Sequence, residues 1–146
     1  MPLPENSVHI ALGLSAVAHG QLMSIDAEAA FHMPGVRAVL TAADIPGTND
    51  CSPVMGDDPI FVKDKIMYHG QTLFAVVADT RAQARDAAEK VQTEITPLGP
   101  ILSIDAAVEQ ESFLEKPMSL SSGEAENAYA TAPCQLSGEL YAGGQE

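Results

Sequence analysis

The chain has 146 residues, and 46% of them are hydrophobic, which suits one globular domain with a real core and is too short for two ordinary ones. Twenty acidic residues against seven basic ones give a net charge of −13. That charge argues against nucleic-acid partners, which require a basic face, and against anionic membrane surfaces. No run approaches the roughly 18 apolar residues of a membrane-spanning helix, so we expect a soluble, cytoplasmic protein.

Strand and helix patterns alternate over the first 110 residues. Residues 8–14 alternate between large apolar and smaller side chains, which predicts a half-buried strand. No Lys or Arg precedes this segment, which argues against the alternative of a signal peptide. Further strands are predicted over 21–25, 36–40, 60–62, 65–68, 72–78 and 92–96. The continuous apolar run 72–78 is typical of a strand that is covered on both faces.

Helices are predicted where capping residues precede an apolar pattern. Thr80 and Gln83 form the pattern of a capping box, and the alanines that follow lie on one helical face. Asp26 is the expected cap of a shorter helix. The shorter helical segments are predicted over 27–33, 41–44 and 104–110.

The C-terminal part is predicted to be less compact. Residues 111–123 have the composition of a polar, extended linker, and a short helix is predicted over 124–131. A last strand is predicted over 135–142, and the sequence ends after it without a turn or a cap. We therefore expect a piece of a longer protein, clipped at both ends.

Metal-binding and catalytic patterns are weak. Cys51 and Cys134 have no Cys or His at metal-ligand spacing, and the sequence leaves open whether they are free thiols or a disulfide. Acidic and amide side chains gather near the loop 46–59, where turn formation is the simpler interpretation and a calcium site is the alternative. These residues are Asp44, Asn49, Asp50, Asp57 and Asp58.

Two glycine-containing segments are candidate sites. His69-Gly70-Gln71 is predicted to form a turn between strands, with a positive φ at Gly70 and a structural role favoured over a ligand-facing one. In Gly143-Gly144-Gln145, the glycines allow close approach of a bulky group and the Gln145 amide can donate a hydrogen bond to an oxo or phosphate oxygen. Glycine pairs also mark bulges, so this pattern alone does not decide the matter.

Five segments together resemble the xanthine dehydrogenase and aldehyde oxidase family of molybdenum hydroxylases. They follow the order of the family and cover nearly the whole chain, and the likeness is greatest to the bacterial molybdopterin-binding subunit. The segments are HIALGLS at 9–15, PGV at 34–36, VLTAADIPGTND at 39–50, YHGQ with LFAVVADT at 68–80, and LSGE with GGQE at 136–146.

The resemblance implies an α+β fold, the α/β hammerhead, with an antiparallel, barrel-like sheet and helices packed on it. It implies a hammerhead domain over 1–110, a linker with a short helix over 111–134, and over 135–146 the first strand of the molybdopterin-binding domain that follows. In the family, the enzyme hydroxylates a purine or an aldehyde with oxygen derived from water. Electrons pass from molybdenum through 2Fe-2S clusters to FAD.

By the same resemblance, Gln145 matches the glutamine that hydrogen-bonds an oxygen ligand of molybdenum. The catalytic base, the substrate-binding residues and most pterin contacts of the family have no counterpart in this sequence. We therefore expect no catalytic residue, no metal ligand and no bound cofactor in this piece, which alone should be inactive. The expected partners are an FAD/iron–sulfur subunit or segment and a small purine or aldehyde substrate.

Three alternatives remain open at this stage. The parent protein could be an aldehyde oxidase rather than a purine hydroxylase. The chain could be a stand-alone scaffold or interaction module of the same fold, or a calcium-dependent binding protein. In addition, strand edges left open by a missing neighbour would favour self-association into a homo-oligomer.

Overall fold

The computed structural model describes residues 3–54, 56–115 and 118–144. The chain divides into two compact units, Met1–Leu102 and Ser103–Glu146. Among the described residues, no helix is long and apolar enough to cross a membrane.

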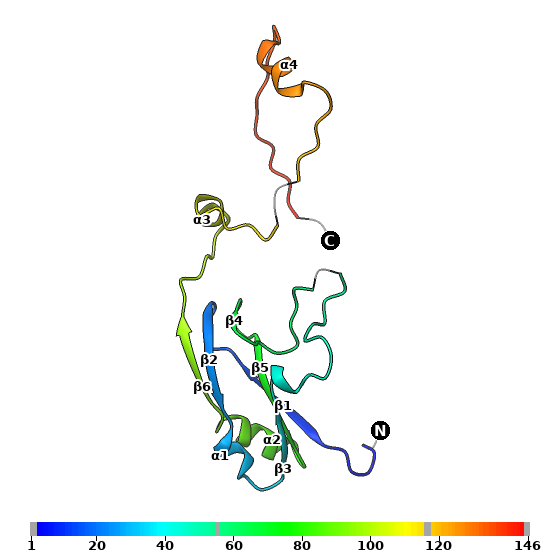
Figure 1. The fold of residues 1–146 in the computed structure, drawn as a ribbon, viewed down its shortest axis with the longest axis vertical. Coiled ribbons are helices and arrows are strands. Elements are labelled where there is room, and N and C mark those ends of the chain that lie inside the picture. The colour runs from blue at the N-terminus through cyan, green and yellow to red at the C-terminus, as the bar shows by residue number, and fades with distance from the viewer. Residues whose placement is uncertain (1–2, 55, 116–117, 145–146) are drawn as a thin grey trace. The chain divides into compact units, whose positions relative to one another are not determined.

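The first unit contains two antiparallel sheets of three strands each (Figure 1). One sheet has the order β1-β5-β3, and the other has the order β4-β2-β6. The strands are β1 (His9–Leu14), β2 (Gly20–Asp26), β3 (Val36–Leu40), β4 (Lys65–Ile66), β5 (Thr72–Ala78) and β6 (Gln92–Pro97).

Helices pack on the sheet whose central strand is β5. In α2 (Arg81–Ala88), the small side chains of Ala84 and Ala87 are fully buried, and the helix lies against β1 and β5. The Thr80 hydroxyl caps α2 by accepting the Gln83 N–H at 3.2 Å, as predicted. The shorter α1 (Glu28–Phe31) contacts β3, and its Glu28 N–H donates to Asp26 at 3.0 Å.

β5 is the centre of the core, as its apolar sequence predicts. It pairs antiparallel with β1 on one side and β3 on the other, and five of its seven residues are buried. Its Leu73, Phe74 and Val76 belong to one hydrophobic cluster with Val39 of β3 and Leu22 of β2. The cluster therefore joins the two sheets through side chains.

The α+β class is confirmed, but the described strands do not close into a barrel. Closure would require pairing between edge strands of the two sheets. β4 has only two residues and is too short to pair with an edge strand of the other sheet. It ends at Ile66 instead of continuing to 68, because the next N–H, that of Met67, donates to the Gln71 side chain at 2.7 Å.

The strand predicted over 60–62 is wrong, and a side chain is the reason. The Asn49 carboxamide accepts the Phe61 N–H at 3.1 Å and donates to the Phe61 carbonyl at 2.7 Å. The backbone N–H and carbonyl of Phe61 are therefore not available to pair with a neighbouring strand. The single-turn helix η1 (Ala42–Asp44) forms as predicted, with Thr41 and Asp44 in a capping box.

The second unit has two short helices, α3 (Ile104–Glu109) and α4 (Ala125–Thr131). None of its described residues is buried. The strand predicted over 135–142 is not formed, since a strand needs a partner backbone and the described residues provide none here. The predicted division of the chain into three parts, with boundaries after residues 110 and 134, stays a prediction.

Candidate functional site

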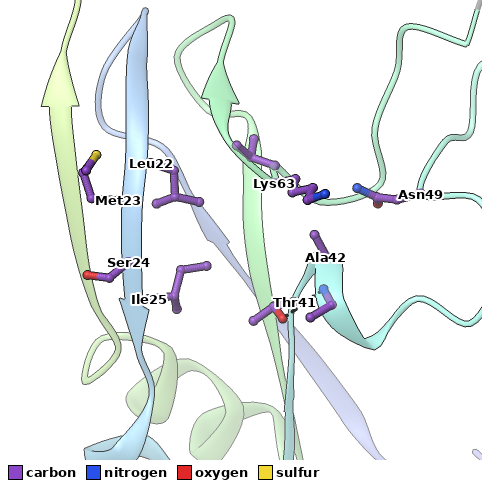
Figure 2. Close-up of a pocket in the computed structure, with 10 residues that line it drawn as sticks. Leu22, Met23, Ser24, Ile25, Thr41, Ala42, Asn49 and Lys63 are labelled. Carbon is purple, nitrogen blue, oxygen red and sulfur yellow. Dashed lines mark hydrogen bonds between the residues drawn. The ribbon is translucent and has the colours of Figure 1, made fainter.

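The first unit contains an open groove of about 510 Å³ between β2, η1 and the loop that follows η1 (Figure 2). Figure 2 shows Leu22 and Ile25 pointing from β2 towards Thr41 and Ala42. The lining residues are Leu22, Met23, Ser24, Ile25, Thr41, Ala42, Ala43, Asn49, Val62 and Lys63.

The described residues that line the groove are mostly apolar. Its floor includes the buried side chains of Leu22 and Val62. The polar groups of Thr41 and Asn49 are already engaged by the capping box and by Phe61. Among the described residues that line the groove, Lys63 is the one charged residue, and no nucleophile lies beside a base. Its apolar wall suits an apolar group.

The acidic loop that follows η1 is held together by its own side chains. The Asp50 carboxylate accepts hydrogen bonds from the Ser52 hydroxyl at 2.9 Å, the Ser52 N–H at 3.2 Å and the Asp58 N–H at 3.1 Å. These bonds, led by that from the Ser52 hydroxyl, lower the pKa of Asp50. Among residues 3–54, 56–115 and 118–144, no three His, Cys, Asp or Glu side chains are placed to hold a metal ion. The calcium interpretation gains no support.

Cys51 lies in the same loop, and its thiol donates to the Asp58 carbonyl at 3.2 Å. Desolvation, together with the nearby carboxylates of Asp58 and Asp50, raises the pKa of this thiol. Cys51 and Cys134 are both exposed, and each is a free thiol within its own unit. A raised pKa makes Cys51 a poor nucleophile.

The turn at 69–71 has a structural role. Gly70 has a φ of 86°, as predicted. Gln71 is 2% exposed, and its side-chain oxygen accepts the Met67 N–H. The Ser15 N–H donates to the Gln71 carbonyl, and the Gly70 N–H donates to the Ser15 carbonyl, both at 2.9 Å. Gln71 therefore ties the end of β1 to the turn before β5.

Comparisons with known proteins match this fold to one family. The family model described as "Aldehyde oxidase and xanthine dehydrogenase, a/b hammerhead domain" matches residues 1–99. A xanthine dehydrogenase of Oryza sativa is 39% identical over 148 residues, which cover 99% of this chain and 11% of the relative. The solved aldehyde oxidoreductase of Desulfovibrio desulfuricans superimposes with a TM-score of 0.70 and 35% identity, over 76% of this chain and 13% of that one.

The chain belongs to this family. Its two antiparallel sheets and packed helices are the α/β hammerhead, and the resemblance read from the sequence is confirmed. Aldehyde oxidase 2 of Cavia porcellus is 38% identical over 147 residues, covering all of this chain and 11% of that relative. The chain thus spans about a tenth of the length of the curated relatives it matches.

One residue of this sequence is predicted to contact the family's cofactor. Gln145, the predicted cofactor contact, lies outside the described residues. The neighbouring Gly143 and Gly144 are exposed, and no atom lies within 4 Å of the position that a Cβ would occupy on either. Within the described residues, Gly143 and Gly144 therefore have no packing neighbours.

Proposed function

We propose that the chain is part of the molybdopterin-binding subunit of a bacterial xanthine dehydrogenase, an enzyme that hydroxylates hypoxanthine and xanthine to urate with oxygen derived from water. The observation that carries the proposal is the 39% identity to a xanthine dehydrogenase over 99% of this chain. The proposed contribution of the chain is a folded hammerhead that supports the catalytic parts of the parent enzyme.

The described residues of the groove include no nucleophile beside a base, which supports a structural role for this chain and places catalysis in other parts of the enzyme. The described lining residues include one Lys and several apolar side chains. The nearby carboxylates of Asp50 and Asp44 accept hydrogen bonds from residues two or three positions away in the sequence. The isolated chain is therefore proposed to be inactive. In the parent, we place molybdenum-molybdopterin on downstream segments, FAD and 2Fe-2S clusters on partner subunits or segments, and the whole in the cytoplasm.

Gln145 is proposed to contact an oxygen ligand of molybdenum in the parent enzyme. The support is the match of Gly143-Gly144-Gln145 to the family motif. In the full-length enzyme, Gln145→Ala should lower kcat for hypoxanthine by roughly 100–1,000-fold, the range seen when one hydrogen-bond donor to a developing oxyanion is removed. Gln135→Ala, ten residues earlier, is the matched control and should leave kcat unchanged.

The substrate test uses the full-length product of the gene that encodes this chain. Purified enzyme is assayed side by side with hypoxanthine and with benzaldehyde, and kcat/KM is compared. The proposal predicts a clear preference for hypoxanthine.

An aldehyde oxidase is the second candidate function, because the aldehyde oxidase of Cavia porcellus is 38% identical, nearly as similar as the xanthine dehydrogenase. A preference for benzaldehyde in the same assay would select it. Turnover of neither compound would contradict both candidates and would favour a stand-alone scaffold or interaction module.

A further inference from the structure

The loop between η1 and β4 is closed by hydrogen bonds where its two ends meet. We call residues 49–52 and 58–61 the neck of this loop. The Asn49 carboxamide holds the backbone of Phe61, twelve residues away, through two bonds of 2.7 and 3.1 Å. The Cys51 N–H donates to the Asp58 carbonyl at 2.9 Å. Loops of about 6–16 residues whose ends lie close together are compact units that frequently carry a function.

A second set of hydrogen bonds in the loop is centred on Asp50 and Ser52. The Asp50 carboxylate accepts the Asp58 N–H at 3.1 Å and the Ser52 hydroxyl at 2.9 Å. The Ser52 hydroxyl oxygen in turn accepts the Gly56 N–H at 2.7 Å. Because Asn49 and Asp50 are neighbours in the chain, the two sets of bonds close the same neck.

Hydrogen bonds, and not buried side chains, hold this loop in place. None of the described residues from 50 to 60 is buried, and Val54 is 83% exposed. A segment with few buried apolar contacts opens at a lower free energy than the core does. The loop can therefore open while the two sheets of the first unit stay folded.

Both flanks of the loop are anchored independently of the neck. On the N-terminal side, η1 is closed by its own capping box between Thr41 and Asp44. On the C-terminal side, the Phe61 and Val62 side chains are buried, and the Val62 N–H donates to the Thr72 carbonyl of β5 at 2.9 Å. These anchors confine an opening to the neck and the residues that it encloses.

We propose that this loop is a conformational device whose latch is Asn49, and that its neck opens and closes as one unit while both sheets stay folded. Asn49 also lines the groove, on the side away from β2 (Figure 2). When the neck is closed, the Asn49 carboxamide is bonded to Phe61. When the neck is open, the carboxamide is free to bond to a group in the groove. The latch therefore couples the loop to the groove, and this inference does not rest on the proposed enzymatic function.

The test is amide hydrogen exchange of the 146-residue chain, followed residue by residue by NMR. The N–H groups of Cys51, Asp58 and Phe61 report on the neck, and the Val62 N–H reports on the anchored flank. Asn49→Ala removes side-chain hydrogen bonds to Phe61 alone. It should nevertheless speed exchange at all three neck reporters by about tenfold or more, and it should leave exchange at Val62 unchanged.

Ser52→Ala is the reciprocal test, because the Ser52 side chain makes no hydrogen bond to Phe61 in the described part of the chain. The substitution removes the hydroxyl that bonds to Asp50 and to the Gly56 N–H. If the neck is one unit, exchange of the Phe61 N–H should also become faster. The matched control Thr131→Ala removes hydroxyl bonds within α4 of the second unit and should leave the neck reporters unchanged.

Two results would overturn the proposal. In Asn49→Ala, unchanged exchange at Cys51 and Asp58 would mean that the contacts of the neck are independent and that Asn49 is no latch. Equal acceleration of the neck reporters and of the β5 amides would mean that the loop opens only when the sheets unfold. Thermal unfolding of each variant verifies that it is folded.

Discussion

A methyl group added at Gly13 tests the packing between β1 and β5. Gly13 lies opposite Phe74 in the antiparallel ladder, and a Cβ at this position would lie 2.0–2.4 Å from three atoms of the Phe74 ring. Real Cβ contacts are never that short, so the ring must move. Phe74 is 4% exposed and belongs to the core cluster, which leaves it little space.

We expect Gly13→Ala to destabilise the hammerhead by about 2 kcal/mol, the middle of the range for overpacked cores. For a domain of this size, that loss lowers Tm by about 10 °C. The measurement is thermal unfolding followed by circular dichroism, with guanidinium unfolding for the free energy. Gly47→Ala is the matched control, because a Cβ there meets nothing within 4 Å.

A second substitution checks the cause. Phe74→Leu removes the ring, so the double variant Gly13→Ala/Phe74→Leu should lose less stability than the sum of the two single variants. Strict additivity, or a Gly13→Ala chain as stable as the wild type, would refute this account of the contact.

Three further predictions concern the polar contacts. Gln71→Ala should cost about 1–3 kcal/mol of unfolding free energy in guanidinium melts, because it leaves the Met67 N–H without its acceptor. Hydrogen bonds lower the pKa of Asp50 below its ordinary value of 3.8, so its stabilising contribution is present above that pH and is lost as the pH falls below it. A pH series of melts should therefore show a shallower acid loss of stability for Asp50→Asn. Arg37→Ala should leave Tm nearly unchanged, because Arg37 and Asp79 are both solvent-exposed and their pairing is screened.

The parts of the fold that were predictable are those governed by local patterns. The apolar run of β5 and the alanine face of α2 specify their elements and their burial. The Thr41–Asp44 capping box needs only residues three apart. Each of these signals lies within a few residues of sequence, so sequence analysis locates it correctly.

The errors in strand prediction arise where a side chain from outside the predicted strand hydrogen-bonds to its backbone. Asn49 binds both backbone groups of Phe61, twelve residues away, and removes the predicted strand over 60–62. Gln71 takes the N–H of Met67 and shortens β4.

The candidate groove could not be predicted, because Leu22, Thr41 and Lys63 come together only through the pairing of separate segments. The prediction for Gln145 came from a family motif rather than from local chemistry. It remains a prediction, since this residue lies outside the described part of the chain.

This chain has the hammerhead fold, and we propose that the chemistry belongs to a larger enzyme. The most direct test assays urate formation from hypoxanthine by the purified 146-residue chain and by the full-length gene product, at equal concentrations. We expect a folded chain without turnover and a full-length enzyme that forms urate. Urate formation by the isolated chain, or its absence in a full-length enzyme loaded with molybdenum, would contradict it.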